Sequence, residues 1–129
     1  MKKILSFIAG AALVLGLASC NVKIENPKAS NFVGTWDLNT IETTATSGSV
    51  TTTPVKTLDY LVITENTITF YENGKQTESG QFDVKDNVIY VDGLSYFNVE
   101  KLTLKEMVLS QDPLLGILVS KYTYYYTKR

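Results

Sequence analysis

The sequence predicts an all-β fold, an eight-stranded antiparallel up-and-down barrel, and three observations support it. Short segments in which apolar and polar residues alternate recur after residue 31, and this is the pattern of strands with one buried face. Turn residues separate these segments at near-regular spacing, with Asn73-Gly74 and Asp92-Gly93 as the strongest hairpin signals. No convincing helical period occurs in the same region. The alternative fold is an open two-sheet β-sandwich.

The first predicted strand, residues 32–42, carries the only tryptophan of the chain, Trp36. Trp36, Leu38 and Thr40 share one face by alternation, so we expect Trp36 in the core. Gly34 precedes it by two residues and would let the backbone pass close to a neighbour, because glycine has no Cβ. Both Gly34 and Trp36 are therefore expected to be structural.

The segment that follows, residues 43–57, is rich in Thr and Ser and has no apolar period. A connection of this length is usually functional or mobile, although its threonines could extend the flanking strands. The remaining strands are expected to close the barrel, since a free edge in the tyrosine-rich last strand would promote aggregation. They cover residues 58–64, 67–72, 78–84, 88–91, 95–101, 107–111 and 119–127.

The N-terminus has the features of a secretory leader. Lys2 and Lys3 precede the apolar run Ile4 to Leu17, which is shorter than the ~20 residues that a membrane-spanning helix needs. The next residues, Leu17-Ala18-Ser19-Cys20, resemble the lipobox of bacterial lipoproteins. This resemblance implies that residues 1–19 are a lipoprotein signal peptide and that Cys20 is lipidated. The alternative is an ordinary signal peptide in which Cys20 is incidental.

A lipid on Cys20 would anchor the protein to a membrane of the bacterial cell envelope. Asn21, rather than Asp, after the cysteine is compatible with the outer membrane by resemblance to other lipoproteins. Residues 20–31 are polar and interrupted by Pro27, and we interpret them as a short tether. Residues 32–129 then form one barrel domain, which is expected to sit close to its membrane.

Composition excludes several functions. Removal of a leader with two lysines and no acid from a chain of net charge −1 leaves a mildly acidic domain, which argues against nucleic-acid binding. The chain has no histidine, the commonest general base and metal ligand, and its single cysteine is assigned to lipidation. No nucleophile elbow, phosphate loop or calcium loop occurs. We therefore expect no enzyme activity, no catalytic residue, no cofactor and no metal.

With this strand order, the chain resembles the lipocalins. Gly34-Thr35-Trp36 matches the Gly-x-Trp of their first strand, and the fold that this implies is an eight-stranded barrel, open at one end, with residues 43–57 as its lid loop. Two family features are missing: the Thr-Asp-Tyr element between strands six and seven, and a helix after the last strand. The basic residue that packs over the tryptophan in the family corresponds to Lys128 or Arg129.

Two groups of residues are candidates for function. One face of the last predicted strand carries a stripe of three tyrosines, Tyr122, Tyr124 and Tyr126. These side chains would either line a cavity for an amphipathic ligand or simply fill a narrow barrel. The apolar connection 112–118 would lie at the mouth, opposite the tether, as a lid, a docking surface for a protein partner or a hydrophobic plug. Its large aliphatic residues are Leu114, Leu115, Ile117 and Leu118.

The sequence thus favours a membrane-anchored envelope lipoprotein whose lipocalin-like barrel binds a small apolar or amphipathic ligand. The alternative is a filled barrel that acts as a protein-interaction or accessory module without a ligand. An interior cavity of at least ~300 Å³ would favour ligand binding over a filled barrel.

Overall fold

The computed structural model describes residues 22–113 and 118–129, which form one antiparallel sheet preceded by a short 3-10 helix, η1 (Ala29–Phe32). The strands lie close to the predicted segments, and two of them, β4 and β6, have the predicted bounds. Their bounds are β1 Gly34–Ala45, β2 Val50–Pro54, β3 Tyr60–Ile63, β4 Thr67–Glu72, β5 Lys75–Lys85, β6 Val88–Val91, β7 Leu94–Leu102, β8 Glu106–Gln111 and β9 Val119–Lys128.

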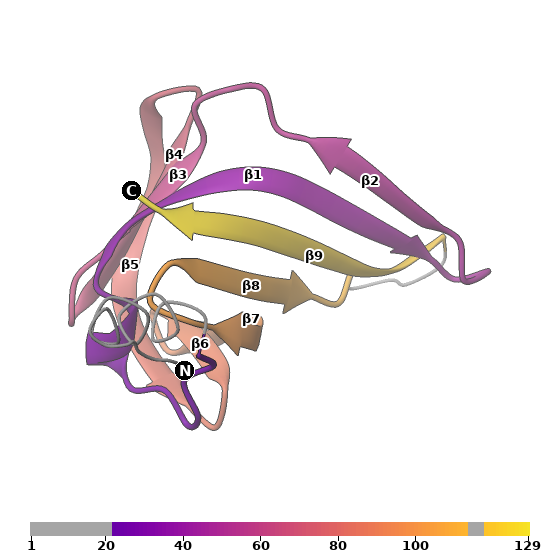
Figure 1. The fold of residues 1–129 in the computed structure, drawn as a ribbon. Helices are drawn as coiled ribbons and strands as arrows, with labels where there is room; N and C mark the ends of the chain where they lie inside the picture. The colour runs from indigo at the N-terminus through magenta and orange to yellow at the C-terminus, as the bar shows by residue number, and fades with distance from the viewer. Residues whose placement is uncertain (1–21, 114–117) are drawn as a thin grey trace, which may run out of the picture.

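The sheet closes on itself, which confirms the predicted barrel and excludes the open sandwich. Each strand from β3 to β9 pairs with the next, and β1 pairs with β3 on one edge and with β9 on the other. The closing register runs from Trp36 opposite Lys128 to Ala45 opposite Val119. Eight strands thus form the barrel, and β2 is an extra strand beside them (Figure 1).

The threonine-rich segment 43–57 is a strand hairpin and not the predicted lid loop. β1 continues to Ala45, the chain turns, and β2 returns along β1 with Thr53 opposite Ile41 and Thr51 opposite Thr43. Threonine has a high β-propensity, so pairing with β1 is enough to order this segment as a strand. Together with β9, the hairpin extends away from the barrel body (Figure 1), and every residue of β2 is exposed.

Large apolar side chains fill the interior of the barrel near the N-terminal end of β1. Trp36 is completely buried, and its indole Nε1 donates a hydrogen bond of 2.8 Å to the carbonyl oxygen of Phe32. Phe32, the last residue of η1, packs edge-on against Phe82 of β5, with ring centroids 5.7 Å apart. We call this end of the barrel the closed end. The other fully buried apolar residues here include Ile63, Ile68, Ile89, Leu102 and Met107.

Two basic residues at the C-terminus have different aromatic partners. The Nζ of Lys128 lies 5.5 Å from the centre of the Trp36 ring, whereas the guanidinium of Arg129 lies 4.5 Å from that of Tyr60. Lys128 is therefore the cation that covers the tryptophan. Gly34 makes this approach possible, since a Cβ at that position would lie 2.6 Å from the Cε of Lys128. Its φ of +146° is also in a region that residues with a side chain rarely adopt.

Most of the segment interpreted as a tether contacts the barrel. The backbone N–H of Ile24 donates to the carbonyl of Leu102, and Pro27 is buried. From Ile24 onward the chain thus belongs to the domain, so the length left for a free linker is shorter than residues 20–31. The predicted signal peptide and Cys20 lie outside the described residues. Among residues 22–113 and 118–129, no helix is long and apolar enough to cross a membrane.

Candidate functional site

The tyrosine stripe of β9 faces the interior of the barrel. Tyr126 lies opposite Met107 of β8, and Tyr124 lies opposite Leu109, both of which are core residues. Exposure increases along the stripe from Tyr126 toward Tyr122: Tyr126 is only 5% exposed, whereas Tyr124 and Tyr122 are half-buried. The stripe therefore leads from the packed core toward the end of the barrel away from η1, which we call the mouth.

Tyr124 is held by a short chain of hydrogen bonds near the mouth. Its hydroxyl donates to Oε1 of Gln111 at 2.7 Å, and Nε2 of Gln111 donates to the backbone oxygen of Tyr96 at 3.1 Å. Phe97 packs edge-on against Tyr124 with ring centroids 5.7 Å apart. Burial, and secondarily the neighbouring Tyr122, raises the pKa of Tyr124, so this phenol stays neutral and keeps its role as a donor.

A pocket of about 220 Å³ opens beside this stripe, and we call it the mouth pocket. It lies where the chain enters β3, between that strand, the β4–β5 hairpin and β7. Its inner wall is formed by Leu38, Leu61, Phe70, Tyr96 and Tyr126. The volume is below the ~300 Å³ that cavities for drug-sized ligands have, so only a small ligand, on the scale of one ring, would fit.

The hydroxyl of Tyr126 is the unusual group of the mouth pocket. Its side chain is more than nine-tenths buried, and within the described residues the hydroxyl makes no hydrogen bond. Buried polar groups are almost always paired, because an unpaired hydroxyl loses its hydration without compensation. Burial, and then the nearby phenols and Asp59, raises the pKa of Tyr126. The pocket wall thus carries a neutral phenol that is able both to donate and to accept.

Three carboxylates also line the mouth pocket, and we call them the rim carboxylates: Asp59, Glu72 and Glu78. Asp59 accepts hydrogen bonds at 2.8 Å from the hydroxyl of Thr57 and at 2.9 Å from the backbone N–H of Asn73, which fixes its position. Glu78 accepts a longer hydrogen bond of 3.4 Å from the Tyr96 hydroxyl. Burial and the charge of Glu78 raise the pKa of Tyr96.

Sequence alternation did not identify Tyr96 or Glu78 as site residues. Irregular pairing between β6 and β7 brings Tyr96 toward the interior beside Phe97, although strict alternation would place these two neighbours on opposite faces. Glu78 lies opposite Phe70, and alternation along the predicted strand 78–84 places it on the same face as Gly80 and Phe82. This phase was a usable signal for Glu78, but charged residues are usually placed on the solvent face. No sequence signal locates the bulge at Tyr96.

A second and larger cleft, of about 490 Å³, lies between β6, β7 and the start of the apolar connection. Tyr122, Gln111 and Pro113 line it. Tyr122 is thus separated from the mouth pocket, which Tyr126 lines. Of the apolar connection, Leu118 is 78% exposed. Leu114, Leu115 and Ile117 lie outside the described residues.

Comparisons of this chain with protein-family models, with curated proteins and with solved structures find no match. Within the described part of the chain, no group of three or more acidic, histidine or cysteine side chains is placed to hold a metal ion. The rim carboxylates accordingly do not form such a group. The functional interpretation therefore rests on the shape and polarity of the mouth pocket.

Proposed function

We propose that this protein is a lipid-anchored lipoprotein of the bacterial cell envelope whose lipocalin-like barrel binds a small amphipathic molecule at its mouth. The single observation that carries ligand binding is the buried hydroxyl of Tyr126, a residue of the mouth pocket wall, which has no hydrogen-bond partner among the described residues. A ligand with one polar group and one ring would supply the missing hydrogen bond. It would also cover the apolar surface of Leu38 and Phe70.

Ligand binding is tested first by native mass spectrometry of the purified protein, which would detect a co-purified small molecule. A quantitative test is isothermal titration with single-ring alcohols, in which Tyr126→Phe should weaken binding by about tenfold, the effect of one hydrogen bond of ~1.4 kcal/mol. Tyr125→Phe is the matched control, because Tyr125 is 36% exposed and its hydroxyl lies near Glu42 on the outer face. Equal affinities for both variants would contradict a site at Tyr126.

Lipid anchoring rests on the lysines, the apolar run and Leu17-Ala18-Ser19-Cys20. The first residues of the domain lie at the closed end, so an anchor there would leave the mouth facing away from the membrane. Metabolic labelling with a fatty-acid analogue should mark the wild-type protein and not Cys20→Ser. Labelling of both would refute lipidation at this residue, and labelling of neither would favour an ordinary signal peptide.

A second candidate function is a filled barrel that serves as a protein-interaction module. The packed interior around Trp36 and Ile68 supports it, as do exposed aliphatic side chains such as Leu58, Leu94 and Leu118. The same titration separates the two candidates. A filled barrel without a ligand site would bind none of the alcohols. If the barrel does bind a ligand, replacement of Leu58 and Leu94 by Ser should leave its affinity for the alcohols unchanged.

A further inference from the structure

We propose that the mouth pocket selects organic cations, and specifically small aromatic or aliphatic amines. This inference rests on the proposed ligand-binding function and names the chemical class of the ligand. The rim carboxylates Asp59, Glu72 and Glu78 line the same pocket as the aromatic and aliphatic side chains of its inner wall. A ligand that combines a ring or a short chain with an ammonium group matches both features.

The charge of the mouth pocket is one-sided. Its lining contains the three rim carboxylates and neither lysine nor arginine. Among the described residues, the ion pairs join Lys101 to Glu106, Lys121 to Glu100 and Arg129 to Asp37, and none includes a rim carboxylate. A ligand anion would therefore be repelled at the opening, whereas a cation would gain charge-assisted hydrogen bonds there.

Arg129 and Asp59 line one surface pocket, but the guanidinium of Arg129 is already engaged elsewhere. Its Nη2 donates to Asp37 at 2.7 Å, its Nε donates to the same carboxylate at 3.3 Å, and its guanidinium stacks over Tyr60. This fork-shaped contact holds the guanidinium beside Asp37. The hydrogen bonds that Asp59 accepts come from neutral groups, and none of the ion pairs among the described residues includes it.

The aromatic wall adds a second means of recognition. Phe70 and Tyr96 lie with ring centroids 5.2 Å apart, and both line the pocket beneath the rim. Ammonium groups are attracted to aromatic faces, and more strongly in a site that excludes water. The hydroxyl of Tyr126, which has no partner within residues 22–113 and 118–129, belongs to the same pocket lining and can accept a hydrogen bond from an ammonium N–H. Cation recognition would thus combine the rim carboxylates, the aromatic wall and this hydroxyl.

A divalent metal ion fits the rim less well than an organic cation. Metal ions need several oxygen ligands that converge within ~2.0–2.6 Å of one point. The described acidic residues form no such group. The pocket volume of about 220 Å³ also exceeds what a bare ion would fill, but it accommodates a single ring with a short amine arm.

The test compares three probes of similar shape on the full-length protein by isothermal titration: phenethylamine, which is charged at pH 7, 2-phenylethanol, which is neutral, and 3-phenylpropanoate, which is anionic. We expect the amine to bind about tenfold tighter than the alcohol, which corresponds to ~1.4 kcal/mol, and the anion to bind weakest. Raising the salt concentration should weaken the amine alone, because charged contacts at the rim are screened.

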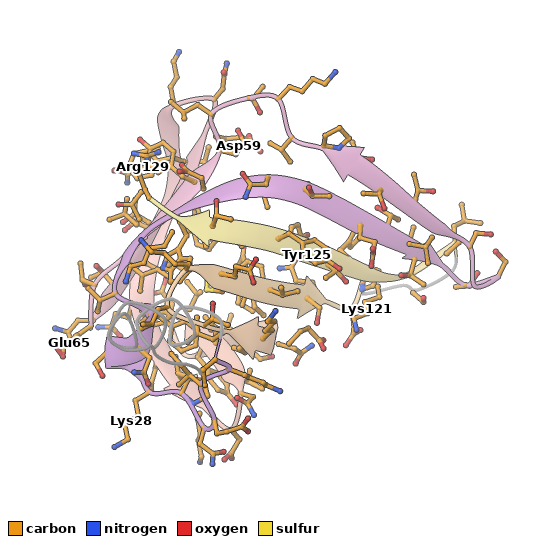
Figure 2. All side chains as sticks on the ribbon, in the orientation of Figure 1. Lys28, Asp59, Glu65, Lys121, Tyr125 and Arg129 are labelled. Carbon is orange, nitrogen blue, oxygen red and sulfur yellow. The ribbon has the colours of Figure 1, made fainter. Side chains whose placement is uncertain are left out.

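Variants assign the selectivity to the rim. Asp59→Asn and Glu78→Gln keep an acceptor for their present hydrogen bonds and remove only the charge, so both should fold. Each should weaken the amine several-fold and leave the alcohol unchanged. Glu65→Gln is the matched control, since Glu65 follows β3 at the end away from Asp59 (Figure 2). It should leave all three probes unchanged.

The outcomes separate this inference from the function on which it rests. If amine and alcohol bind equally and the rim variants change neither, the pocket binds ligands without charge selection and the inference is overturned. Tighter binding of the anion would overturn it as well. If none of the probes binds and Tyr126→Phe has no effect, the proposed ligand-binding function fails together with it.

Discussion

Replacement of Tyr126 by Phe should stabilise the ligand-free protein, although it removes a polar group from a well-ordered strand. The Tyr126 ring is packed in the core cluster, and Phe retains all of these contacts. Only the hydroxyl is lost, and within the described residues it has no hydrogen-bond partner. The substitution therefore removes a desolvated group and breaks no bond.

The size of the effect follows from two opposing contributions. A buried hydroxyl without a partner costs about 1–3 kcal/mol in mutational data. The lost oxygen atom leaves a void smaller than a methyl group, which costs less than ~1 kcal/mol, and here it only widens the existing mouth pocket. We expect a net stabilisation of about 1 kcal/mol, or a Tm higher by about 4–8 °C for a domain of this size.

The assay is urea unfolding followed by circular dichroism, with the midpoint and the slope fitted separately. A higher midpoint with an unchanged slope would assign the gain to the native state. Tyr125→Phe on the opposite face of β9 provides the control, and it should change stability by less than ~0.5 kcal/mol. A loss of more than ~1 kcal/mol in Tyr126→Phe would show that the hydroxyl is paired in solution, and would refute the reasoning.

Three further predictions concern the closed end and the outer face. Gly34→Ala should destabilise by about 2–4 kcal/mol, because it forces a strained φ and displaces Lys128, and the double variant with Lys128→Ala should lose about 1 kcal/mol less than the sum in urea unfolding. Trp36→Ala should lower the free energy of unfolding by about 3–5 kcal/mol, and an unchanged Tm would contradict its core position. A hydrogen bond from the Ser110 hydroxyl, at 2.6 Å, lowers the pKa of Glu100, with Lys121 contributing. Because the folded pKa lies below the unfolded one, the stabilisation is complete above the unfolded value and is lost as pH falls through the folded value. Glu100→Gln should therefore cost about 0.5–1 kcal/mol at pH 7, a figure already reduced for the exposure of Glu100. Its difference from the wild type should shrink as the pH falls in acid-unfolding curves, and a constant difference across pH would contradict it.

Local pattern predicted most strands, because a half-buried strand must alternate apolar and polar residues wherever it occurs. The bounds of β4 and β6 follow from this rule together with the turn residues that flank them, such as Asn73-Gly74 and Asp92-Gly93. Barrel closure was also predictable, because the tyrosine-rich last strand would otherwise have a free edge that promotes aggregation. The Tyr124 and Tyr126 face of β9 followed from the same alternation.

The threonine-rich hairpin shows where local pattern stops. Residues 50–54 contain no apolar face, so no alternation could identify them as a strand. Their order comes from pairing with β1, which supplies the backbone hydrogen-bond partners that the segment lacks by itself. The choice between Lys128 and Arg129 as the partner of Trp36 depends in the same way on which side of β9 faces the indole.

The sequence by itself determined the strand pattern, the turns and the absence of histidine, which are properties of each segment alone. Only the tertiary structure decided the site. The irregular pairing of β6 with β7 brings Tyr96 in beside Phe97, whereas Glu78 keeps the phase of Gly80 and Phe82 and lies opposite Phe70. A bulge inserts one residue into one strand and shifts the phase of its side chains, and this depends on how two strands meet. The mouth pocket, with its three carboxylates and the buried hydroxyl of Tyr126, exists only after the barrel has closed.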